Sequence, residues 1–228
     1  MGSLPNFRDF ELSYVATLEK PALGLYFRWG ELYASLLDHF AHFQTKPSDI
    51  RVDNPGSGAP SDYVLLCYLL EFSVIARFRI GSIEIWTKNR SVASNPEATS
   101  ALMEAAIKSV GAVEPTASPG QHFLTAQGHF EVEGDPLSAR LARYVSEPPN
   151  ASPPMRAFGL VYSSDLPGGA KGFFRLEQSL KYLDRSCGFV RVEGEFPGAT
   201  NPLEICRSTD GFFRAAFERL TLTVGSAT

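Results

Sequence analysis

Two histidines on a predicted helix come closest to a chemical site by residue type and spacing. His39 and His42 lie three positions apart in the stretch DHFAHF, and Asp38 and Glu31 could add carboxylate oxygens. Two imidazoles at this spacing share one side of a helix and can bind one metal ion. A third ligand would have to come from elsewhere in the chain. An exposed Asp38–His42 pair on the polar side of the helix explains the same residues more simply, so we favour a structural role.

The remaining histidines and the thiols give no catalytic pattern. His122 and His129 are seven residues apart, so on one regular strand they face opposite sides of a sheet and do not act together. No GxSxG nucleophile motif occurs. Three scattered cysteines without CxxC spacing are typical of a reduced protein with buried or incidental thiols. They are Cys67, Cys187 and Cys206. We expect no cofactor.

Composition restricts the class of protein. The 228 residues suffice for one large domain or two fused half-domains, and 44% hydrophobic content supports a substantial core. A net charge of −4 argues against nucleic acid as the main partner, because such proteins present a basic face. The longest apolar run, VLLCYLL at 64–70, is too short to span a membrane. The N-terminal segment has no apolar signal-peptide region, so we expect a cytoplasmic protein.

Hydrophobic patterns predict the strands and helices that carry these residues. Residues 10–18 alternate as a strand, and the apolar positions of 31–43 recur on one side of a helix, which carries His39 and His42. Asn95 followed by Pro96 is typical of a helix start and predicts a helix over 96–113. Further strands of this half are predicted at 24–30, 63–70, 72–80 and 82–88.

The second part of the chain repeats this order. GLYFRWGE at 24–31 has an echo in GHFEVEGD at 128–135, which is 104 positions later, and Asn201-Pro202 repeats the Asn-Pro helix start. We therefore predict an internal duplication, with half-modules at 1–113 and 122–224 joined by a linker at 114–121. The expected elements of the second half are strands in 122–133, 155–163, 173–182 and 189–196, a helix from 134, and a final helix from 201 that Gly211 bends.

The predicted fold class is α+β. Antiparallel strands from both halves form the sheet or sheets, helices pack on one face, and two related β-α-β-β-β-α halves meet about a pseudo-twofold axis. This order is similar in outline to the duplicated strand–helix–strand–strand modules of the GyrI-like effector-binding and SOUL haem-binding proteins. Because the resemblance is one of topology, it implies a binding role without identifying a ligand.

The strand predicted at 24–30 raises a question about Arg28. Side chains alternate between the two faces of a strand, and the apolar set here is Leu25, Phe27 and Trp29, which leaves Tyr26 and Arg28 on the opposite face. An inward arginine needs a buried partner or an anionic ligand. A strand near the edge of the sheet would instead let Arg28 reach water, and we favour this interpretation.

Three functions stay open. The first is a non-catalytic binding module that holds a small, partly apolar ligand in the cleft between the related halves, because pockets favour such junctions. The expected lining is Tyr26, Arg28, Trp29, Trp86, Phe130 and Tyr162. The second is a structural or regulatory subunit that docks a protein partner, or self-associates as a homodimer, through a sheet edge or a charged outer face. That face is expected to carry Arg77, Arg79, Arg175, Glu177, Lys181, Arg191, Glu193 and Glu195. The third, which we favour least, is an enzyme with an unrecognised active site.

Overall fold

The computed structural model of the protein describes residues 7–53, 63–132, 137–141, 159–182 and 187–225. Its strands are β1 (Phe7–Leu18), β2 (Ile50–Asp53), β3 (Val64–Leu69), β4 (Val74–Arg79), β5 (Ser82–Thr87), β6 (Pro119–Glu131), β7 (Gly159–Leu166), β8 (Ala170–Gln178) and β9 (Cys187–Pro197). Its α-helices are α1 (Leu23–Phe27), α2 (Trp29–His39), α3 (Arg90–Ala93), α4 (Pro96–Val113), α5 (Leu137–Leu141) and α6 (Pro202–Gly225).

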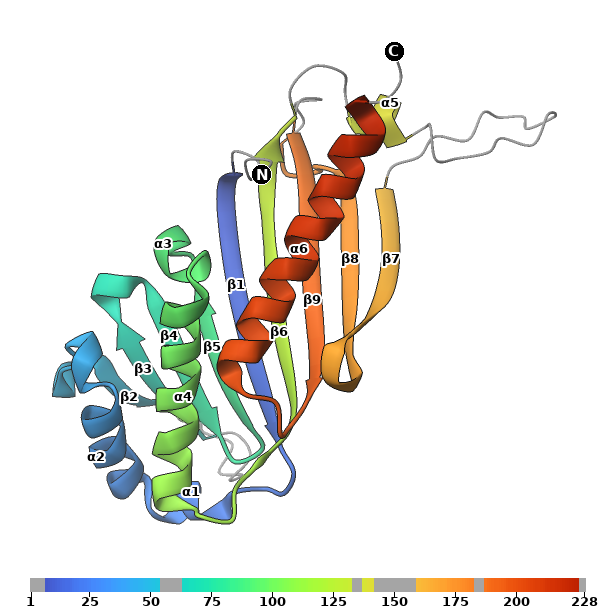
Figure 1. The fold of residues 1–228 in the computed structure, drawn as a ribbon. Coiled ribbons are helices and arrows are strands. Elements are labelled where there is room, and N and C mark those ends of the chain that lie inside the picture. The colour runs from blue at the N-terminus through green and yellow to red at the C-terminus, as the bar shows by residue number, and fades with distance from the viewer. Residues whose placement is uncertain (1–6, 54–62, 133–136, 142–158, 183–186, 226–228) are drawn as a thin grey trace.

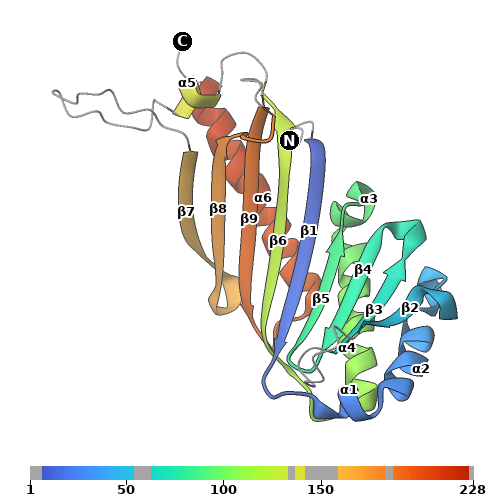
Figure 2. The ribbon, with the colours of Figure 1, turned by 180° about the vertical axis from the view of Figure 1, so that it is seen from behind.

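All of these strands form one antiparallel sheet. Their order is β2-β3-β4-β5-β1-β6-β9-β8-β7, so the longest strands, β1 and β6, lie side by side at its centre (Figure 1). The long helices α2, α4 and α6 pack on one face, and the opposite face of the described sheet carries no helix (Figure 2). The α+β class with helices on one face is therefore confirmed.

The strand order is symmetrical about the central pair. β5, β4 and β3 follow β1 on one side, and β9, β8 and β7 follow β6 on the other. This matches the predicted order of strand, helix, three strands and helix, with β2 and the short helices α1 and α3 added in the first half. Descent of the halves by duplication stays a prediction. β6 begins at Pro119, so the last part of the predicted linker belongs to a strand.

The Asn-Pro helix starts fold as predicted. The Asn95 side chain accepts hydrogen bonds from the backbone N–H groups of Glu97 (3.0 Å) and Ala98 (3.1 Å), which caps α4. The Asn201 side chain accepts one from Leu203 N–H at 2.8 Å, at the start of α6. α6 runs without a break through Gly211, and the predicted bend at this residue stays a prediction. The predicted strand residues 155–158 and the helix beyond Leu141 lie outside the described residues.

The strand predicted at 24–30 is wrong, because these residues form α1 and the start of α2. The alternation of large apolar residues did not reflect burial, since the side chains of Phe27 and Trp29 are 74% and 56% exposed. The buried positions are instead Leu25, Leu32 and Leu36, whose spacing is helical. The two-glycine echo therefore pairs a helical segment with a strand and does not mark equivalent elements.

The interior consists of two hydrophobic clusters on the helical face of the sheet. The first lies under α2 and α4 and includes Tyr14, Phe40 and Met103. The second lies under α6 and includes Phe130 and Phe174. The first cluster extends into the second half through Phe196, Ile205 and Cys206, and the two clusters meet over β1 and β6, near Phe10 and Phe130.

A buried polar chain crosses this junction. The Nε2–H group of His122 donates to the Gly198 carbonyl (3.0 Å), so the neutral ring presents Nδ1 to the Tyr14 hydroxyl, which donates at 2.8 Å. His122 and Tyr14 are 1% and 0% exposed. Burial lowers the pKa of His122, although the bond to the carbonyl opposes this shift, and burial raises the pKa of Tyr14. The junction between the halves is thus specified by hydrogen bonds as well as by apolar packing.

Candidate functional site

An open cleft lies on the helical face where the two hydrophobic clusters meet. α4 and α6 touch near Cys206, whose Sγ is 3.5 Å from Met103 Sδ, and they diverge toward α3 (Figure 1). Between them, over β1 and β6, is about 650 Å³ of empty space including the opening to solvent. The lining residues are Phe7, Phe10, Leu12, Arg90, Ala93, Ser94, Pro96, Thr99, Leu124, Ala126, Cys206, Thr209, Asp210 and Phe213.

The floor of the cleft comes from the central strand pair. Leu12 lies opposite Ala126 in the ladder, and the small alanine side chain leaves space above the sheet. A register shift between Phe7 and Asp9 puts the rings of Phe7 and Phe10 on the same side, with their centroids 5.1 Å apart. Gly128 makes this possible, since a Cβ there would lie 2.9 Å from the Phe7 ring. The cleft therefore depends on a bulge and on two small residues.

Its walls come from helices of both halves. Cys206, Thr209, Asp210 and Phe213 recur at helical spacing along one side of α6. The opposite wall is the corner between α3 and α4, where the Thr99 hydroxyl donates to the Val92 carbonyl at 2.9 Å. Each half contributes one strand and one wall, so the cleft exists only when both are folded together.

One buried polar group in the cleft has no partner. Thr209 is 3% exposed, and its Oγ1 is the one buried side-chain nitrogen or oxygen without a hydrogen bond among the described residues. The hydroxyl packs against the sheet at Gly194, where an added Cβ would lie 2.8 Å from Oγ1 and 2.4 Å from the Phe196 ring. An unsatisfied buried hydroxyl in a native fold calls for an explanation, and a bound water or ion is one of the known ones.

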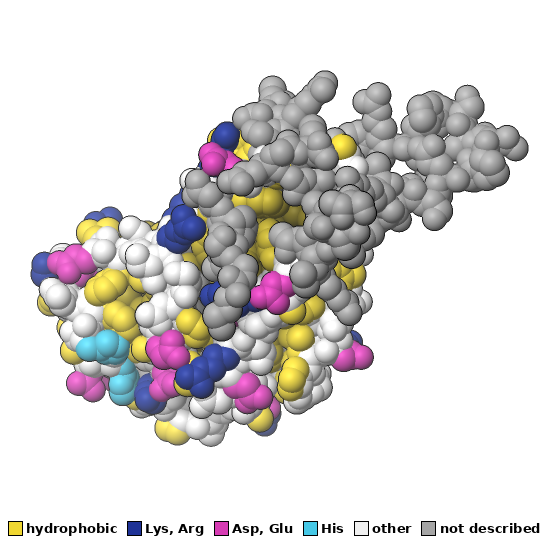
Figure 3. Space-filling model, turned by 45° about the horizontal axis from the view of Figure 1, so that its top comes forward, with side chains coloured by type: hydrophobic (Ala, Val, Ile, Leu, Met, Phe, Trp, Pro, Cys, Tyr) yellow, Lys and Arg dark blue, Asp and Glu magenta, His cyan; other side chains and the backbone are white. Residues whose placement is uncertain are grey.

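The deep lining is uncharged. Burial, together with the nearby Glu97 carboxylate, raises the pKa of the Cys206 thiol to about 12, so it stays protonated at neutral pH. Asp210, at the rim, pairs with Arg214 at 2.7 Å. Figure 3 views the molecule from this side and shows hydrophobic side chains at the base of the hollow. The cleft suits a molecule that is mostly apolar.

A second hollow lies at the far side of the first half. It is lined by α1, α2 and the ends of β2, β3 and β4, and it holds about 900 Å³ of empty space including its opening. Tyr26 and Trp29, two of the predicted site residues, lie here together with the exposed Phe27. Their neighbour Arg28 approaches Glu31 (3.4 Å) and Glu114 (3.8 Å) and is partly exposed, but it lies between two helices and not on the edge strand that we favoured.

The other three predicted site residues lie apart from this hollow. Trp86 is on the outer face of β5, where the Lys88 ammonium lies 4.9 Å from its ring centroid. Phe130 and Tyr162 belong to the second hydrophobic cluster under α6. The six residues thus do not line one common cleft, and none of them lines the cleft between the halves.

The histidine pair of the first helix forms no metal site in the structure. His39 ends α2, and His42 follows in a short 3-10 turn with its ring centroid 3.8 Å from that of Phe43. No cluster of three potential metal ligands (His, Cys, Asp or Glu) occurs among the described residues. All three cysteines are buried.

The outer face of the sheet carries the expected mixed charge. Its arginines pair with neighbouring glutamates: Arg175 with Glu177 (2.6 Å) and Arg191 with Glu193 (2.7 Å). Arg77 and Arg79 both approach Glu84, at 3.8 and 3.6 Å. These partly exposed pairs largely neutralise one another, and the surface is not a basic face.

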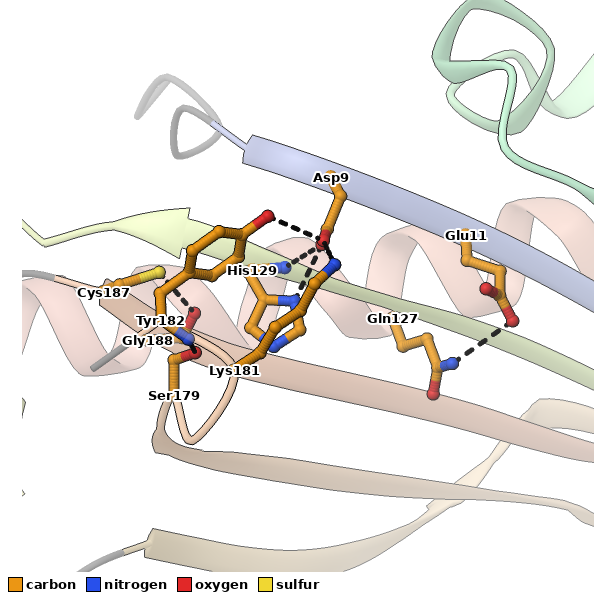
Figure 4. A network of polar contacts seen from close by, with 9 residues as sticks. All are labelled: Asp9, Glu11, Gln127, His129, Ser179, Lys181, Tyr182, Cys187 and Gly188. Carbon is orange, nitrogen blue, oxygen red and sulfur yellow. Dashed lines mark hydrogen bonds and ion pairs between the residues drawn. The ribbon is translucent and has the colours of Figure 1, made fainter. Parts of the chain in front are cut away.

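A polar network centred on Asp9 lies on that face (Figure 4). Its Oδ1 accepts from the backbone N–H of His129 (3.0 Å) and from the ring Nδ1 (2.8 Å), and its Oδ2 accepts from Lys181 (2.5 Å) and Tyr182 (3.2 Å). Burial alone would raise the pKa of Asp9, but the bonds from Lys181 and His129 outweigh it and hold this pKa well below its usual range.

The network contains an aspartate–histidine pair, Asp9 and His129, but neither residue lines one of the two clefts. His129 faces outward and His122 inward, as their spacing predicted, so the two rings do not cooperate. The pair holds the Lys181–Tyr182 segment against the end of β1, which we interpret as a structural role. An acid–base reaction would also need a bound substrate, and neither cleft includes these residues.

Sequence reasoning missed the residues that line the cleft. Arg90 and Thr209 stand out only once α3 and α6 face each other across the sheet. The available signal was the spacing of Cys206, Thr209 and Phe213, which puts a polar group on the apolar side of the last helix. Phe7 and Phe10 depend on a bulge that the alternation does not reveal.

Comparison with known proteins adds no function. No protein-family model matches the chain, and no curated protein matches it. Among solved structures it is similar to Methanococcus jannaschii TBP, with 13% identity over 95% of this chain and 97% of that chain, at a TM-score of 0.33. A similarity this low carries no argument about function. No helix of the described residues is long and apolar enough to cross a membrane.

Proposed function

We propose that the protein is a non-catalytic binding module that holds a small, partly apolar ligand in the cleft between its two halves. The observation that carries this proposal is the unpartnered, buried hydroxyl of Thr209 in a cleft that is mostly apolar. Ligand pockets are mostly apolar with a few polar groups that orient the ligand, and they favour junctions between structural units.

The proposal is tested by titrating the protein with octanol and following methyl resonances by NMR. Those of Leu12 and Leu124, at the floor of the cleft, should shift, whereas those of Leu36 and Leu69, buried elsewhere in the core, should not. At about 100 times the dissociation constant, a ligand stabilises the folded state by about 2.7 kcal/mol. Uniform or absent shifts would count against a site in this cleft.

A matched pair of variants locates the site. Ala126→Leu puts three carbons into the cleft and should abolish octanol binding, while Ala215→Leu adds the same group to the exposed side of α6 and should leave binding unchanged. Equal binding by both variants would place the ligand elsewhere. If Ala126→Leu unfolds, Ala126→Val provides a smaller obstruction, which should weaken binding rather than abolish it.

A second candidate function, self-association, is favoured by the β2 edge strand. Val52 is 47% exposed at this edge and lines the hollow that contains Phe27 and Trp29. If two β2 strands paired antiparallel about Val52, Arg51 of each copy would lie opposite Asp53 of the other, which is a self-complementary arrangement.

Light scattering and sedimentation test this candidate through charge reversal. Arg51→Asp should dissociate a dimer, and the double variant Arg51→Asp/Asp53→Arg should restore it. Val161→Lys, on the opposite edge strand β7, is the control and should have no effect. A monomeric wild-type protein at high concentration would rule this candidate out.

A further inference from the structure

The rim of the cleft carries an arginine that forms no ion pair with an acidic residue of the described chain. Arg90, at the start of α3, is exposed and lines the cleft, and its guanidinium carbon lies 5.8 Å from the centroid of the Phe7 ring. No ion pair of Arg90 is found among the described residues. A guanidinium held against an aromatic ring keeps its N–H groups available for an anion.

The other charges near this rim are already paired. Asp210 accepts from Arg214 at 2.7 Å, and Glu97, at the start of α4, accepts from Arg207 at 2.9 Å. These carboxylates therefore have their own arginines, and Arg90 remains as the unmatched positive charge beside an apolar cavity.

The structure also restricts what kind of anion fits. The first free N–H groups of α4 would be a common anion site, but the Asn95 side chain already accepts from those of Glu97 and Ala98. That leaves a single arginine fork, which matches the two oxygens of one carboxylate. A phosphate would bring more charge than one exposed arginine neutralises.

The position of Arg90 is fixed by the local fold. The Asn89 side chain accepts from Ser91 N–H at 3.0 Å and so caps α3, while Thr99 ties α3 to α4 through the Val92 carbonyl at 2.9 Å. The backbone that carries the arginine is thereby held at the rim, and the side chain reaches over Phe7 into the opening.

We infer that the ligand of this cleft is a small amphipathic monocarboxylate. Its apolar body lies between α4 and α6 over Leu124 and Ala126, and its carboxylate accepts hydrogen bonds from the Arg90 guanidinium at the rim. This inference rests on the proposed function, since it names the chemical class that the same cleft takes.

The test compares octanoate with octanol, which share a tail and differ in the head group. Calorimetric titration of the wild-type protein at low ionic strength should show octanoate binding roughly 3- to 10-fold more tightly, a range set by the partial exposure of the arginine. The preference should shrink as salt is raised, because exposed charges are screened.

Two charge-removing variants locate the head group. In Arg90→Gln the preference for octanoate over octanol should disappear, and octanol binding by the same variant checks that the cleft is still formed. Lys88→Gln removes the same charge nearby, from an ammonium that contacts the Trp86 ring on the outer face, and should retain the preference.

The outcomes separate the two proposals. Equal affinity for octanol and octanoate in the wild type would overturn the carboxylate inference and leave the apolar cleft standing. A preference that survives in Arg90→Gln would also overturn it, since the head group would then lie elsewhere. If neither probe binds, the proposed function and this inference both fail.

Discussion

The Tyr14–His122 hydrogen bond offers a demanding test of how the two halves are joined. Tyr14→Phe removes only the hydroxyl that donates to His122 Nδ1 at 2.8 Å and keeps the packing of the ring. The imidazole nitrogen would then be a buried acceptor without a donor. Leaving such a group unsatisfied costs about 1–3 kcal/mol, because it has lost its hydration as well.

The expected shift in melting temperature follows from chain length. The entropy of unfolding is roughly 2.1 cal/mol/K per residue near 60 °C, which gives about 0.5 kcal/mol/K for 228 residues. A cost of about 2 kcal/mol should therefore lower the melting temperature by about 4 °C. Urea unfolding should show a lower midpoint with an unchanged slope.

Tyr33→Phe is the matched control. The Tyr33 hydroxyl donates to the Pro47 carbonyl at 3.2 Å near the surface, where water can replace it, so this variant should lose no more than about 0.5 kcal/mol. If the two variants lose the same free energy of unfolding, the buried Tyr14–His122 hydrogen bond stabilises the junction no more than a surface hydrogen bond does.

Titration supplies an independent test of the same site. Because burial lowers the pKa of His122 in the folded state, the unfolded chain binds the proton first as pH falls below about 6.5. The free energy of unfolding should then fall with decreasing pH by up to about 1.4 kcal/mol per unit. His122→Gln should lack this component, and an identical pH slope in both proteins would refute the assignment.

Four further results are expected. Gly194→Ala should cost about 1–3 kcal/mol, since the new methyl group meets a ring and a hydroxyl, whereas Gly211→Ala meets nothing and should stabilise α6 by roughly 0.5–1 kcal/mol; thermal unfolding distinguishes them. Thr209→Val should raise the stability of the ligand-free protein by about 1 kcal/mol in urea unfolding, because the unsatisfied hydroxyl is gone. Loss of the Asn95 cap in Asn95→Ala should cost about 1 kcal/mol by the same measurement. Asp9→Asn should cost about 1 kcal/mol at pH 7, discounted for partial exposure, and should flatten the loss of stability below about pH 4, where Asp9 of the unfolded chain binds a proton while Asp9 of the folded protein stays ionised.

Local signals in the sequence were sufficient for much of the fold. The start of α4 follows from Asn95 and Pro96, because capping is decided by a few neighbouring residues. Strict alternation over residues 10–18 gave the inward set that includes Leu12 and Tyr14. The strand prediction for residues 24–30 was wrong because a sequence does not show whether alternating aromatic residues are buried or exposed. Only packing decides between strand and helix in such a short segment.

The cleft could not be predicted in the same way. Its lining joins β1 to β6 and α3 to α6, so it depends on contacts between residues about 100 or more positions apart, such as Cys206 with Met103. The aromatic residues of the predicted site were chosen by residue type alone. In the structure Tyr26 and Trp29 lie in the second hollow, Trp86 lies on the outer face of the sheet, and Phe130 and Tyr162 belong to the second hydrophobic cluster. The structure has a cleft where the two halves meet, and none of the six residues expected to line it lies there. That this cleft binds a ligand stays a proposal.

The central pairing of β1 with β6 limits the routes by which a ligand could enter the cleft. A continuous backbone ladder joins the halves along strands of 12 and 13 residues, so they cannot swing apart like jaws without breaking the middle of the sheet. A ligand therefore enters through the opening of the cleft between α3 and α6, above a floor that the paired strands hold in place. Each half expressed alone would leave a long bare strand edge, which is a hazard for aggregation.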